Sequence, residues 1–235
     1  TYNAHGFLKT YHDVITDTAT DVTKAIDWTA DFADGYNDEG QLTHYEETKL
    51  EQAAGYQITV TTTRSGITYN NEGQMTGYAE DVQKDDSVLA QSSSDVHTIR
   101  TATTYTTLGL LKYYADEITY LTGSTALTVN VRFGQNNAAA VTPIYDVFGR
   151  LGDYYETKRE TGAGEGTTLD VTTITHKAGL NGIGLIGYND LTGQMTSYRE
   201  VMAKQGQAEV TTDRSLITYN AHGFLKTYHD VITDT

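Results

Sequence analysis

Two histidines and an aspartate near the start of the sequence have side chains that could bind a metal ion or transfer protons. His5 and His12 supply imidazoles and Asp13 supplies a carboxylate. A metal or acid–base site needs its groups held in a fixed geometry, whereas His5 falls in an expected turn and His12 beyond the end of the same hairpin. We interpret these residues as surface or interface polar groups. The same interpretation applies to the other histidines and to a second copy of the cluster: His44, His97, His176, His222, His229 and Asp230.

Closely spaced carboxylates offer a second kind of chemistry, the binding of hard cations. The candidates are spaced four apart or flank an expected turn: Asp13, Asp17, Asp21, Asp34, Asp38 and Glu39. The Asp-x-Asp-x-Asp-Gly calcium loop is absent. We therefore expect no cofactor, and weak calcium binding is the one option that these carboxylates leave open.

The glycine-rich stretch from Gly162 to Gly166 resembles a phosphate-binding loop in composition only. It lacks the G-x-G-x-x-G spacing, no helical pattern follows it, and Glu165 would repel a phosphate. We expect a hairpin tip there. Since the sequence also lacks the nucleophile-elbow, HExxH and Ser-x-x-Lys motifs, it predicts no enzyme.

The elements that would position these residues are strands. Tyr (18) far outnumbers Phe (5), Pro occurs once, 22 glycines are available for turns, and Thr is abundant in the 235 residues. Thr and Tyr suit a pleated, half-exposed surface, so the composition predicts an all-β fold.

Charge and apolar content exclude several classes of partner. The net charge of −15 argues against nucleic acid, whose phosphates would be repelled. No apolar run approaches the roughly 18 residues that a membrane-spanning helix needs. The absence of Cys excludes a disulfide framework and thiolate metal sites.

The sequence repeats itself at long range. Residues 218–235 (TYNAHGFLKTYHDVITDT) are identical to residues 1–18. We interpret residues 1–217 as one complete long repeat and residues 218–235 as the start of the next. In a longer array, we expect Leu-Ile before Thr1 and Ala-Thr-Asp-Val after Thr235, and the main partners to be copies of the same block, in one chain or side by side.

A shorter motif, Tyr-Asn/Asp-x-x-Gly-x-Leu/Met-x-x-Tyr, recurs within the long repeat. Six units start near residues 2, 36, 69, 105, 145 and 188. The fourth lacks the Asn, and the sixth has one extra residue before its glycine. The motif residues, taken as structural hairpin positions, are Tyr2, Gly6, Tyr11, Tyr36, Gly40, Tyr45, Tyr69, Gly73, Tyr78, Tyr105, Gly109, Tyr114, Tyr145, Gly149, Tyr154, Tyr188, Gly193 and Tyr198.

The motif has the chemistry of a β-hairpin. An Asn or Asp at the first turn position bonds its own backbone, and a Gly that tolerates positive φ follows. A type I turn with a left-handed Gly closes a hairpin with a bulge. For the third unit this pairing places Tyr69 opposite Met75 and Ile67 opposite Gly77.

Longer alternating runs lie between the hairpins. Apolar residues recur at every second position from Leu127 to Phe133 and from Tyr56 to Val60, which predicts strands. The run from Val22 to Phe32 also fits a strand, with a helix as the alternative. We therefore expect repeated hairpins stacked into a solenoid-like or spiralling sheet that is elongated rather than globular.

The segment Tyr145-Asp146-Val147-Phe148-Gly149-Arg150-Leu151 resembles the YDxxGRL pattern of YD repeats, which occur in Rhs proteins, toxin-complex C components and teneurins. The other units resemble Asn-for-Asp and Gln-for-Arg variants of it. The resemblance implies hairpins wound into a spiralling sheet that can close as a shell around a toxin. This chain departs from it, because it lacks the family's proline-rich core segment and self-cleaving aspartates. Its long repeat also favours an open assembly.

The sequence thus predicts an extracellular or cell-surface structural protein: a fibre, stalk or sheath of a bacterium, with adhesion as a downstream role. The first alternative is a glycan-binding adhesin with a groove of Tyr and carboxylates. Sugar-binding repeats of that kind are rich in Trp, and this sequence has only Trp28. The second alternative is an Rhs-like shell that encloses a toxin.

Overall fold

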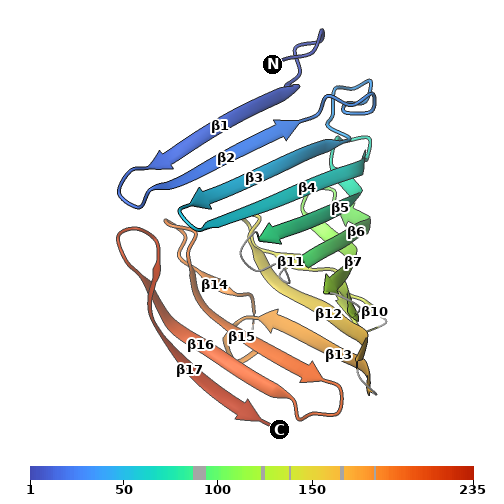
Figure 1. The fold of residues 1–235 in the computed structure, drawn as a ribbon. Coiled ribbons are helices and arrows are strands. Elements are labelled where there is room, and N and C mark those ends of the chain that lie inside the picture. Colours follow the sequence, from blue (N-terminus) through green and yellow to red (C-terminus); the bar gives the residue numbers. More distant parts are fainter. Residues whose placement is uncertain (87–93, 123–124, 138, 165–166, 183) are drawn as a thin grey trace. The chain divides into compact units, whose positions relative to one another are not determined.

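The protein is built from β-strands, as expected. The computed structural model describes residues 1–86, 94–122, 125–137, 139–164, 167–182 and 184–235. Within these residues there is no α-helix, only strands and the 3-10 turn η1 (Leu180–Gly182) (Figure 1). The strands are β1 (Thr10–Asp17), β2 (Val22–Thr29), β3 (Tyr45–Ala53), β4 (Tyr56–Tyr69), β5 (Met75–Asp86), β6 (Ser94–Tyr105), β7 (Leu111–Thr122), β8 (Thr125–Phe133), β9 (Gln135–Asn136), β10 (Ala139–Ala140), β11 (Ile144–Tyr145), β12 (Leu151–Gly164), β13 (Thr167–Ala178), β14 (Gly187–Tyr188), β15 (Met195–Lys204), β16 (Val210–Tyr219) and β17 (Leu225–Asp234).

Hydrogen bonds join the strands into a sheet that follows chain order and does not close on itself. The order is β1-β2-β3-β4-β5-β6-β7-β8-β12-β13-β15-β16-β17, with β11 and β14 paired beside it to β12 and β15. The short strands β9 and β10 pair separately. Neighbours in sequence are therefore neighbours in the sheet, and β1 and β17 are the two terminal strands of the described order.

By contact density the chain divides into two compact units. Unit 1 comprises Thr1–Thr103, Asp116–Thr128 and Gly162–Thr167, and unit 2 comprises Thr104–Ala115, Val129–Thr161 and Thr168–Thr235. Glu165 and Gly166, at the tip predicted between Gly162 and Gly166, lie outside the described residues. Each unit is described by itself.

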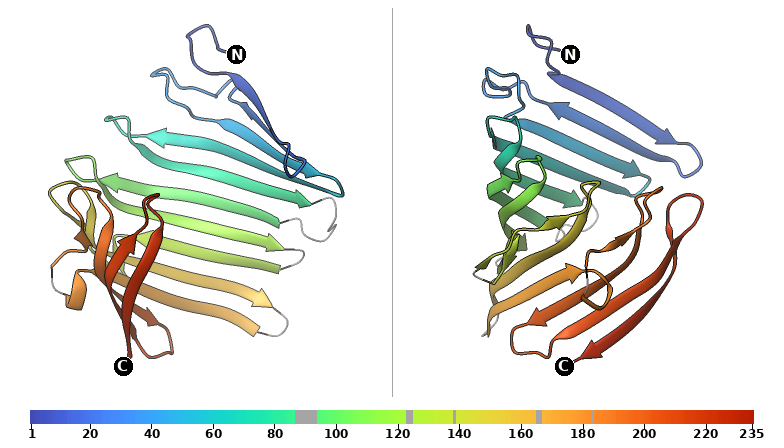
Figure 2. Two further views of the ribbon diagram at one scale, coloured as in Figure 1. Left: turned by 90° about the vertical axis from the view of Figure 1, so that its left-hand side faces the viewer. Right: turned by 180° about the vertical axis from the view of Figure 1, so that it is seen from behind.

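In unit 1, strands β1 to β5 lie side by side in antiparallel pairs (Figure 2). Tyr11 of β1 faces Trp28 of β2, and Tyr45 of β3 faces Arg64 of β4. The run starting at Val22 is a strand and not the alternative helix. Alternation puts Ile26 and Trp28 at same-face positions of β2, where Trp28 packs between rings on both neighbouring strands.

The register of the third hairpin differs from the expected one at one point. Tyr69 faces Met75 as predicted, but Gly77 faces Thr68, so the predicted pairing of Ile67 with Gly77 is wrong. The register shifts on both sides of Thr68. Gly66, with φ +59°, occupies the extra position that β4 carries before Ile67.

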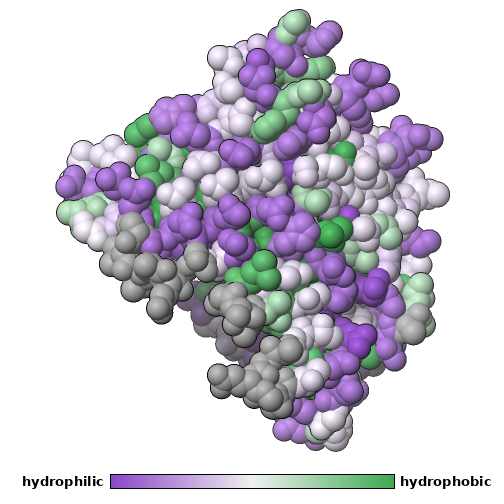
Figure 3. Space-filling model, turned by 45° about the vertical axis from the view of Figure 1, so that its right-hand side comes forward, coloured by the Kyte–Doolittle hydropathy of each residue, from purple (hydrophilic) through white to green (hydrophobic). Residues whose placement is uncertain are grey.

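Few residues are buried, because most residues of the strands are at least partly exposed. Ala30 and Ile67 are buried in unit 1, and Val129, Phe133, Ala178, Ile186 and Ile217 are buried in unit 2. No large side chain among the described residues is completely covered. The face drawn in Figure 3 is accordingly dominated by hydrophilic and intermediate residues, with small separate apolar patches.

Candidate functional site

Each hairpin turn is fixed by the residue after its first tyrosine. In the first hairpin, Asn3 Oδ1 accepts hydrogen bonds from the backbone N–H of His5 (3.0 Å) and of Phe7 (2.9 Å), and Gly6 adopts φ +81°. These bonds hold the turn without help from other elements. Equivalent acceptors in the other turns are Asn37, Asn70, Asp146, Asn189, Asn220 and, where the motif lacks Asn, the hydroxyl of Thr106.

The first tyrosine of a hairpin bonds the backbone of the hairpin before it. In unit 1, Tyr36 Oη donates to the carbonyl of Leu8 at 2.6 Å, and Tyr69 Oη donates to the carbonyl of Leu42 at 2.7 Å. Both acceptors lie two residues after the motif glycine. We call this contact the tyrosine bridge. In unit 2 it joins Tyr145 to Leu111 (2.6 Å), Tyr188 to Leu151 (2.8 Å) and Tyr219 to Met195 (3.0 Å).

The tyrosine bridge is made by partly buried hydroxyls. Burial raises the pKa of Tyr36, Tyr69, Tyr145 and Tyr188 above the ordinary value of 10.0. A neutral phenol is the form that can donate to a carbonyl, and burial disfavours the phenolate. The bridge therefore favours the protonated tyrosines and couples each hairpin to its predecessor.

The residue after each motif glycine rests on the next turn. A Cβ added to Gly40 would lie 2.4 Å from Phe7 Cζ, and the Phe7 ring stacks on Tyr36 with centroids 5.0 Å apart. A Cβ at Gly73 would likewise meet Gln41 at 3.2 Å. In unit 2 the same relation joins Leu110 to Gly149 and Gln194 to Gly223. At Gly40 and Gly73 the missing side chain thus also leaves room for the preceding hairpin, whereas a Cβ at Gly193 would meet nothing within 4 Å.

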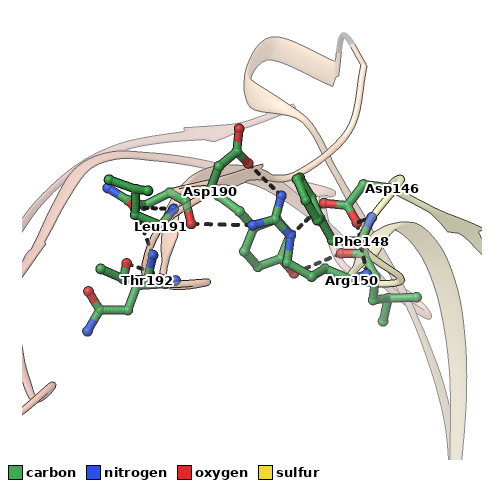
Figure 4. A network of polar contacts seen from close by, with 10 residues as sticks. Asp146, Phe148, Arg150, Asp190, Leu191 and Thr192 are labelled. Carbon is green, nitrogen blue, oxygen red and sulfur yellow. Dashed lines mark hydrogen bonds and ion pairs between the residues drawn. The ribbon is translucent and has the colours of Figure 1, made fainter.

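Arg150 makes the contact between successive turns through ion pairs (Figure 4). Its guanidinium bonds Asp146 of its own turn at 2.6 Å and reaches Asp190 of the next turn at 2.8 Å. It also donates to the backbone carbonyl of Asn189 at 3.3 Å, and it lies over the ring of Phe148 at 4.7 Å. One side chain therefore ties the fifth hairpin to the sixth.

A row of rings and cations crosses the strands of unit 1. We call it the ring row, and from β1 to β6 it contains Tyr11, Trp28, Tyr45, Arg64, Tyr78 and Arg100. Tyr11 and Trp28 stack with centroids 5.7 Å apart, and the Arg64 guanidinium lies 4.4 Å from the centre of the Tyr78 ring. Stacked rings contribute about 0.5–1.5 kcal/mol per pair, and exposed cation–π contacts about 0.5–1 kcal/mol.

Unit 2 contains ring rows of the same kind. Phe133 lies between Tyr114 and Tyr154, with centroids 5.5 Å from each. Further along the sheet the row continues with Lys177 over Tyr198 (4.3 Å) and with Arg214 next to Tyr198 (5.6 Å) and Tyr228 (3.9 Å). The second tyrosine of each motif therefore packs against a ring or a cation on an adjacent strand.

The arginines of the row also bind a carboxylate on the next strand. Arg64 binds Glu80, and Arg100 binds Asp116 through two bonds of 2.7 and 2.6 Å. In unit 2, Arg214 binds Asp230 through two bonds of 2.7 Å, which holds the pKa of that carboxyl below its ordinary value. Bidentate Arg–carboxylate pairs fix the register of the two strands as well as the distance between them.

The two copies of the 18-residue segment form the same turn. In the second copy, Asn220 Oδ1 accepts from the amides of His222 (2.9 Å) and Phe224 (3.0 Å), and Gly223 has φ +81°, as Gly6 has. The cross-strand contact between Thr1 and Thr10 hydroxyls recurs in that copy as well. The neighbours of the two copies differ, since the first packs on β2 and the second on β16.

The histidines and acidic residues considered for chemistry lie apart. His12 pairs with Asp27 (2.6 Å), while His5 lies in its turn against Phe7. Three of the other histidines also face an aspartate: His44 with Asp34, His97 with Asp81 and His176 with Asp153. These pairs are cross-strand or loop contacts at separate places, and none includes a nucleophile.

The acidic residues do not gather around a cation position. Among the described residues no group of three or more His, Asp or Glu could hold a metal ion. Asp17 instead accepts from the amide of Ala19 (2.9 Å) and the hydroxyl of Thr20 (2.8 Å), and these bonds lower its pKa. Its carboxylate stabilises the turn between β1 and β2.

Unit 2 has a polar hollow of about 470 Å³. Its lining combines amide, hydroxyl and charged side chains: Asn130, Arg132, Gln135, Asn137, Thr157, Arg159, Asp170, Thr172 and Gln205. Arg159 and Asp170 bind each other through two bonds of 2.8 and 2.7 Å. Such a lining offers donors and acceptors to a polar ligand and no aromatic platform.

Half of the ring row was missed from the sequence. The motif tyrosines were identified, but their partners on the alternate strands were not. A signal for three of them is an arginine five residues before a motif tyrosine: Arg64 before Tyr69, Arg100 before Tyr105, and Arg214 before Tyr219. The partners Trp28, Phe133 and Lys177 share no such spacing, because the connections that follow them differ in length.

Comparison with protein-family models, curated proteins and solved structures gave no match for this chain. Within the described residues, no helix has the length and apolar character needed to cross a membrane. The turns, the ring rows and the two terminal strands are therefore the basis on which a function can be assigned.

Proposed function

We propose that this chain is one period of an extended structural protein, a surface fibre, stalk or sheath outside the cell, built by stacking β-hairpins. Each hairpin provides the surface against which the next hairpin packs. Tyrosine bridges, turn-to-turn contacts and ring rows all join neighbouring hairpins or strands, so adding a unit adds the same kinds of contact.

The observation that carries the proposal is the behaviour of the two identical segments. Residues 1–18 and 218–235 form the same turn, yet one packs against a following strand and the other against a preceding strand. A segment that accepts neighbours on both sides can be an interior element of a longer stack. A tandem array of blocks that contain such segments extends along one axis. A closed domain does not require a long repeat of this kind.

The composition is compatible with this location and use. A net charge of −15 keeps neighbouring fibres apart in water, and the absence of Cys makes stability independent of redox conditions. The hairpins resemble the YD repeats of Rhs proteins, toxin-complex C components and teneurins, and this resemblance supports a stack of repeated hairpins.

Electron microscopy of chains with one, two and three 217-residue blocks tests the proposal. We expect rods whose length grows by a constant increment per block, because each block adds the same stack. Round particles that only gain volume would contradict it, and hollow closed particles would favour a shell that encloses cargo. A chain in which the added blocks have scrambled sequence is the matched control.

The polar hollow of unit 2 favours a second function, glycan binding. Sugars are recognised by amides, carboxylates and arginines, all of which line this hollow. A glycan array tests it with the parent chain and with Arg159→Ala, which removes the guanidinium from the lining. Binding that is lost in the variant would support an adhesin, and an empty array with intact rods would exclude it.

A further inference from the structure

Strand β5 shows what a motif strand contacts when both of its edges are occupied. Its Tyr78 ring lies near Arg64 of β4 (4.4 Å) and near Arg100 of β6 (5.5 Å). Two residues further on, Glu80 binds Arg64. The arginine lies five positions before the motif tyrosine Tyr69, which itself bridges to the preceding hairpin.

The first copy of the 18-residue segment makes only the contacts to the following side. Tyr11, the counterpart of Tyr78, stacks on Trp28, and Phe7 packs on Tyr36. Tyr2, which would make a tyrosine bridge to a preceding hairpin, is 70% exposed. Asp13, the counterpart of Glu80, lies on the outermost strand of the described sheet order.

The second copy makes only the contacts to the preceding side. Tyr219 forms its bridge to Met195, and Tyr228 lies 3.9 Å from the guanidinium of Arg214. Phe224 is 69% exposed, whereas its counterpart Phe7 is half-buried and stacks on Tyr36 of the next hairpin. Together the two copies make the full set of contacts that β5 makes alone.

We propose that the β16 edge of one block is the docking site for β1 of a second copy, in the register that β17 occupies. Asp13 of the second copy then binds Arg214 of the first, and its Tyr11 lies between that arginine and its own Trp28. Tyr2 of the second copy donates to the carbonyl of Met195. This inference rests on the proposed function and specifies its junction, a head-to-tail contact that leaves a new free edge at each step.

Opening the β16 edge in the 235-residue chain tests the site. Tyr228→Ala with Asp230→Lys removes the two side-chain contacts of β17 to Arg214 and adds a like charge, which favours displacement of residues 218–235 from β16. We expect concentration-dependent association of this variant in size-exclusion chromatography with light scattering, because Tyr11 and Asp13 of another molecule still fit the edge. Adding Tyr11→Ala and Asp13→Lys should restore the monomer.

Circular dichroism of both variants checks that the sheet is retained. Equal association with and without the changes at Tyr11 and Asp13 would overturn the proposed site. So would a folded chain that ends at Ile217, and therefore lacks β17, if it stays monomeric.

Disulfide trapping tests the register, since the chain has no natural Cys. Thr211 faces Thr233 in the β16–β17 pair, and Thr16 is the counterpart of Thr233 in the first copy. In the Tyr228→Ala/Asp230→Lys background, a chain with Thr211→Cys should cross-link to a chain with Thr16→Cys. A partner with Val14→Cys, two residues away on the same face, should cross-link much less.

Different results would contradict the register of the docked strand and the structural role of the protein. Equal or reversed yields from Thr16→Cys and Val14→Cys would overturn the proposed register, even if multi-block chains form rods. Multi-block chains that are globular would overturn the structural function, whatever the cross-linking shows.

Discussion

The hydroxyl of Tyr69 donates a 2.7 Å hydrogen bond to the backbone carbonyl of Leu42, 27 residues earlier in the chain. The bond crosses from one hairpin to the one before it, and Tyr36 makes the same bond to Leu8. Because the acceptor is a main-chain group, any side chain at the Leu position can serve. Each hairpin therefore gains part of its stability from its neighbour.

We predict that Tyr69→Phe lowers the free energy of unfolding by about 1–2 kcal/mol, because a partly buried carbonyl loses its donor. Urea denaturation followed by circular dichroism and by the fluorescence of the single tryptophan, Trp28, measures the change. Tyr2→Phe is the matched control, since Tyr2 is 70% exposed and should be nearly neutral. Equal effects of the two substitutions would show that the bridge contributes nothing.

The architecture could be read from the sequence where local chemistry decides it. The Asn–Gly turn of the Tyr69 hairpin and the pairing of Tyr69 with Met75 follow from turn preferences and alternation, and both are found. The all-β fold follows from the same residues. The bulge at Gly66 did not follow, because its position depends on how β4 continues beyond the hairpin.

The contacts between hairpins could not be predicted. The acceptor of the tyrosine bridge is a backbone carbonyl. Every residue has one, so the sequence does not identify the acceptor. The partner of Tyr45 in the ring row, Arg64, lies on another strand at a distance set by a variable connection. Only the recurrence of Arg five residues before Tyr carries a signal, and its meaning depends on knowing that adjacent strands are paired.

Thr103 has a buried hydroxyl whose oxygen has no hydrogen-bond partner among the described residues. Ile67 and Ile217 hold the same place, three residues after an arginine, and are buried too. We predict that Thr103→Val raises the free energy of unfolding by about 1 kcal/mol, because it removes an unsatisfied polar group without changing the shape. Thr104→Val, at the exposed neighbouring position, should change it little. A loss of stability in Thr103→Val would mean that the hydroxyl has a partner after all.

Leu216 adopts φ +54° with its side chain 74% exposed, at the position where the corresponding strand of unit 1 has Gly66. L-residues pay about 1–2 kcal/mol in this left-handed conformation. Leu216→Gly should therefore raise the unfolding free energy by about 0.5–1 kcal/mol, after the flexibility of Gly is offset. Gly66→Leu, where a Cβ meets nothing within 4 Å, should lower it. Thermal unfolding of both variants checks the opposite signs, and changes of the same sign would refute this account.

Acid should weaken unit 2 through its arginine-bound carboxylates. Hydrogen bonds from Arg199 and Arg214 lower the pKa of Asp213 and Asp230 below the ordinary value of 3.8. A depressed folded-state pKa means that the contribution is complete above 3.8 and is lost as the pH falls through the lower, folded value. Arg199→Met should reduce the acid dependence of the unfolding free energy attributable to Asp213. An unchanged acid profile in that variant would show that this pair is not linked to folding.

Alkali should act on the tyrosine bridges with the opposite sign. Burial raises the pKa of Tyr36 and Tyr69 above 10.0, so their contribution is complete below that pH and is lost as the pH rises through the folded value. A phenolate cannot donate to the carbonyl of Leu42. The difference in unfolding free energy between the parent chain and Tyr69→Phe should therefore be constant near pH 8 and shrink above about pH 10. Tyr2→Phe, which has no bridge, controls for the general effect of alkali. A difference for Tyr69→Phe that stays constant to about pH 11 would mean that the bridge does not require the proton.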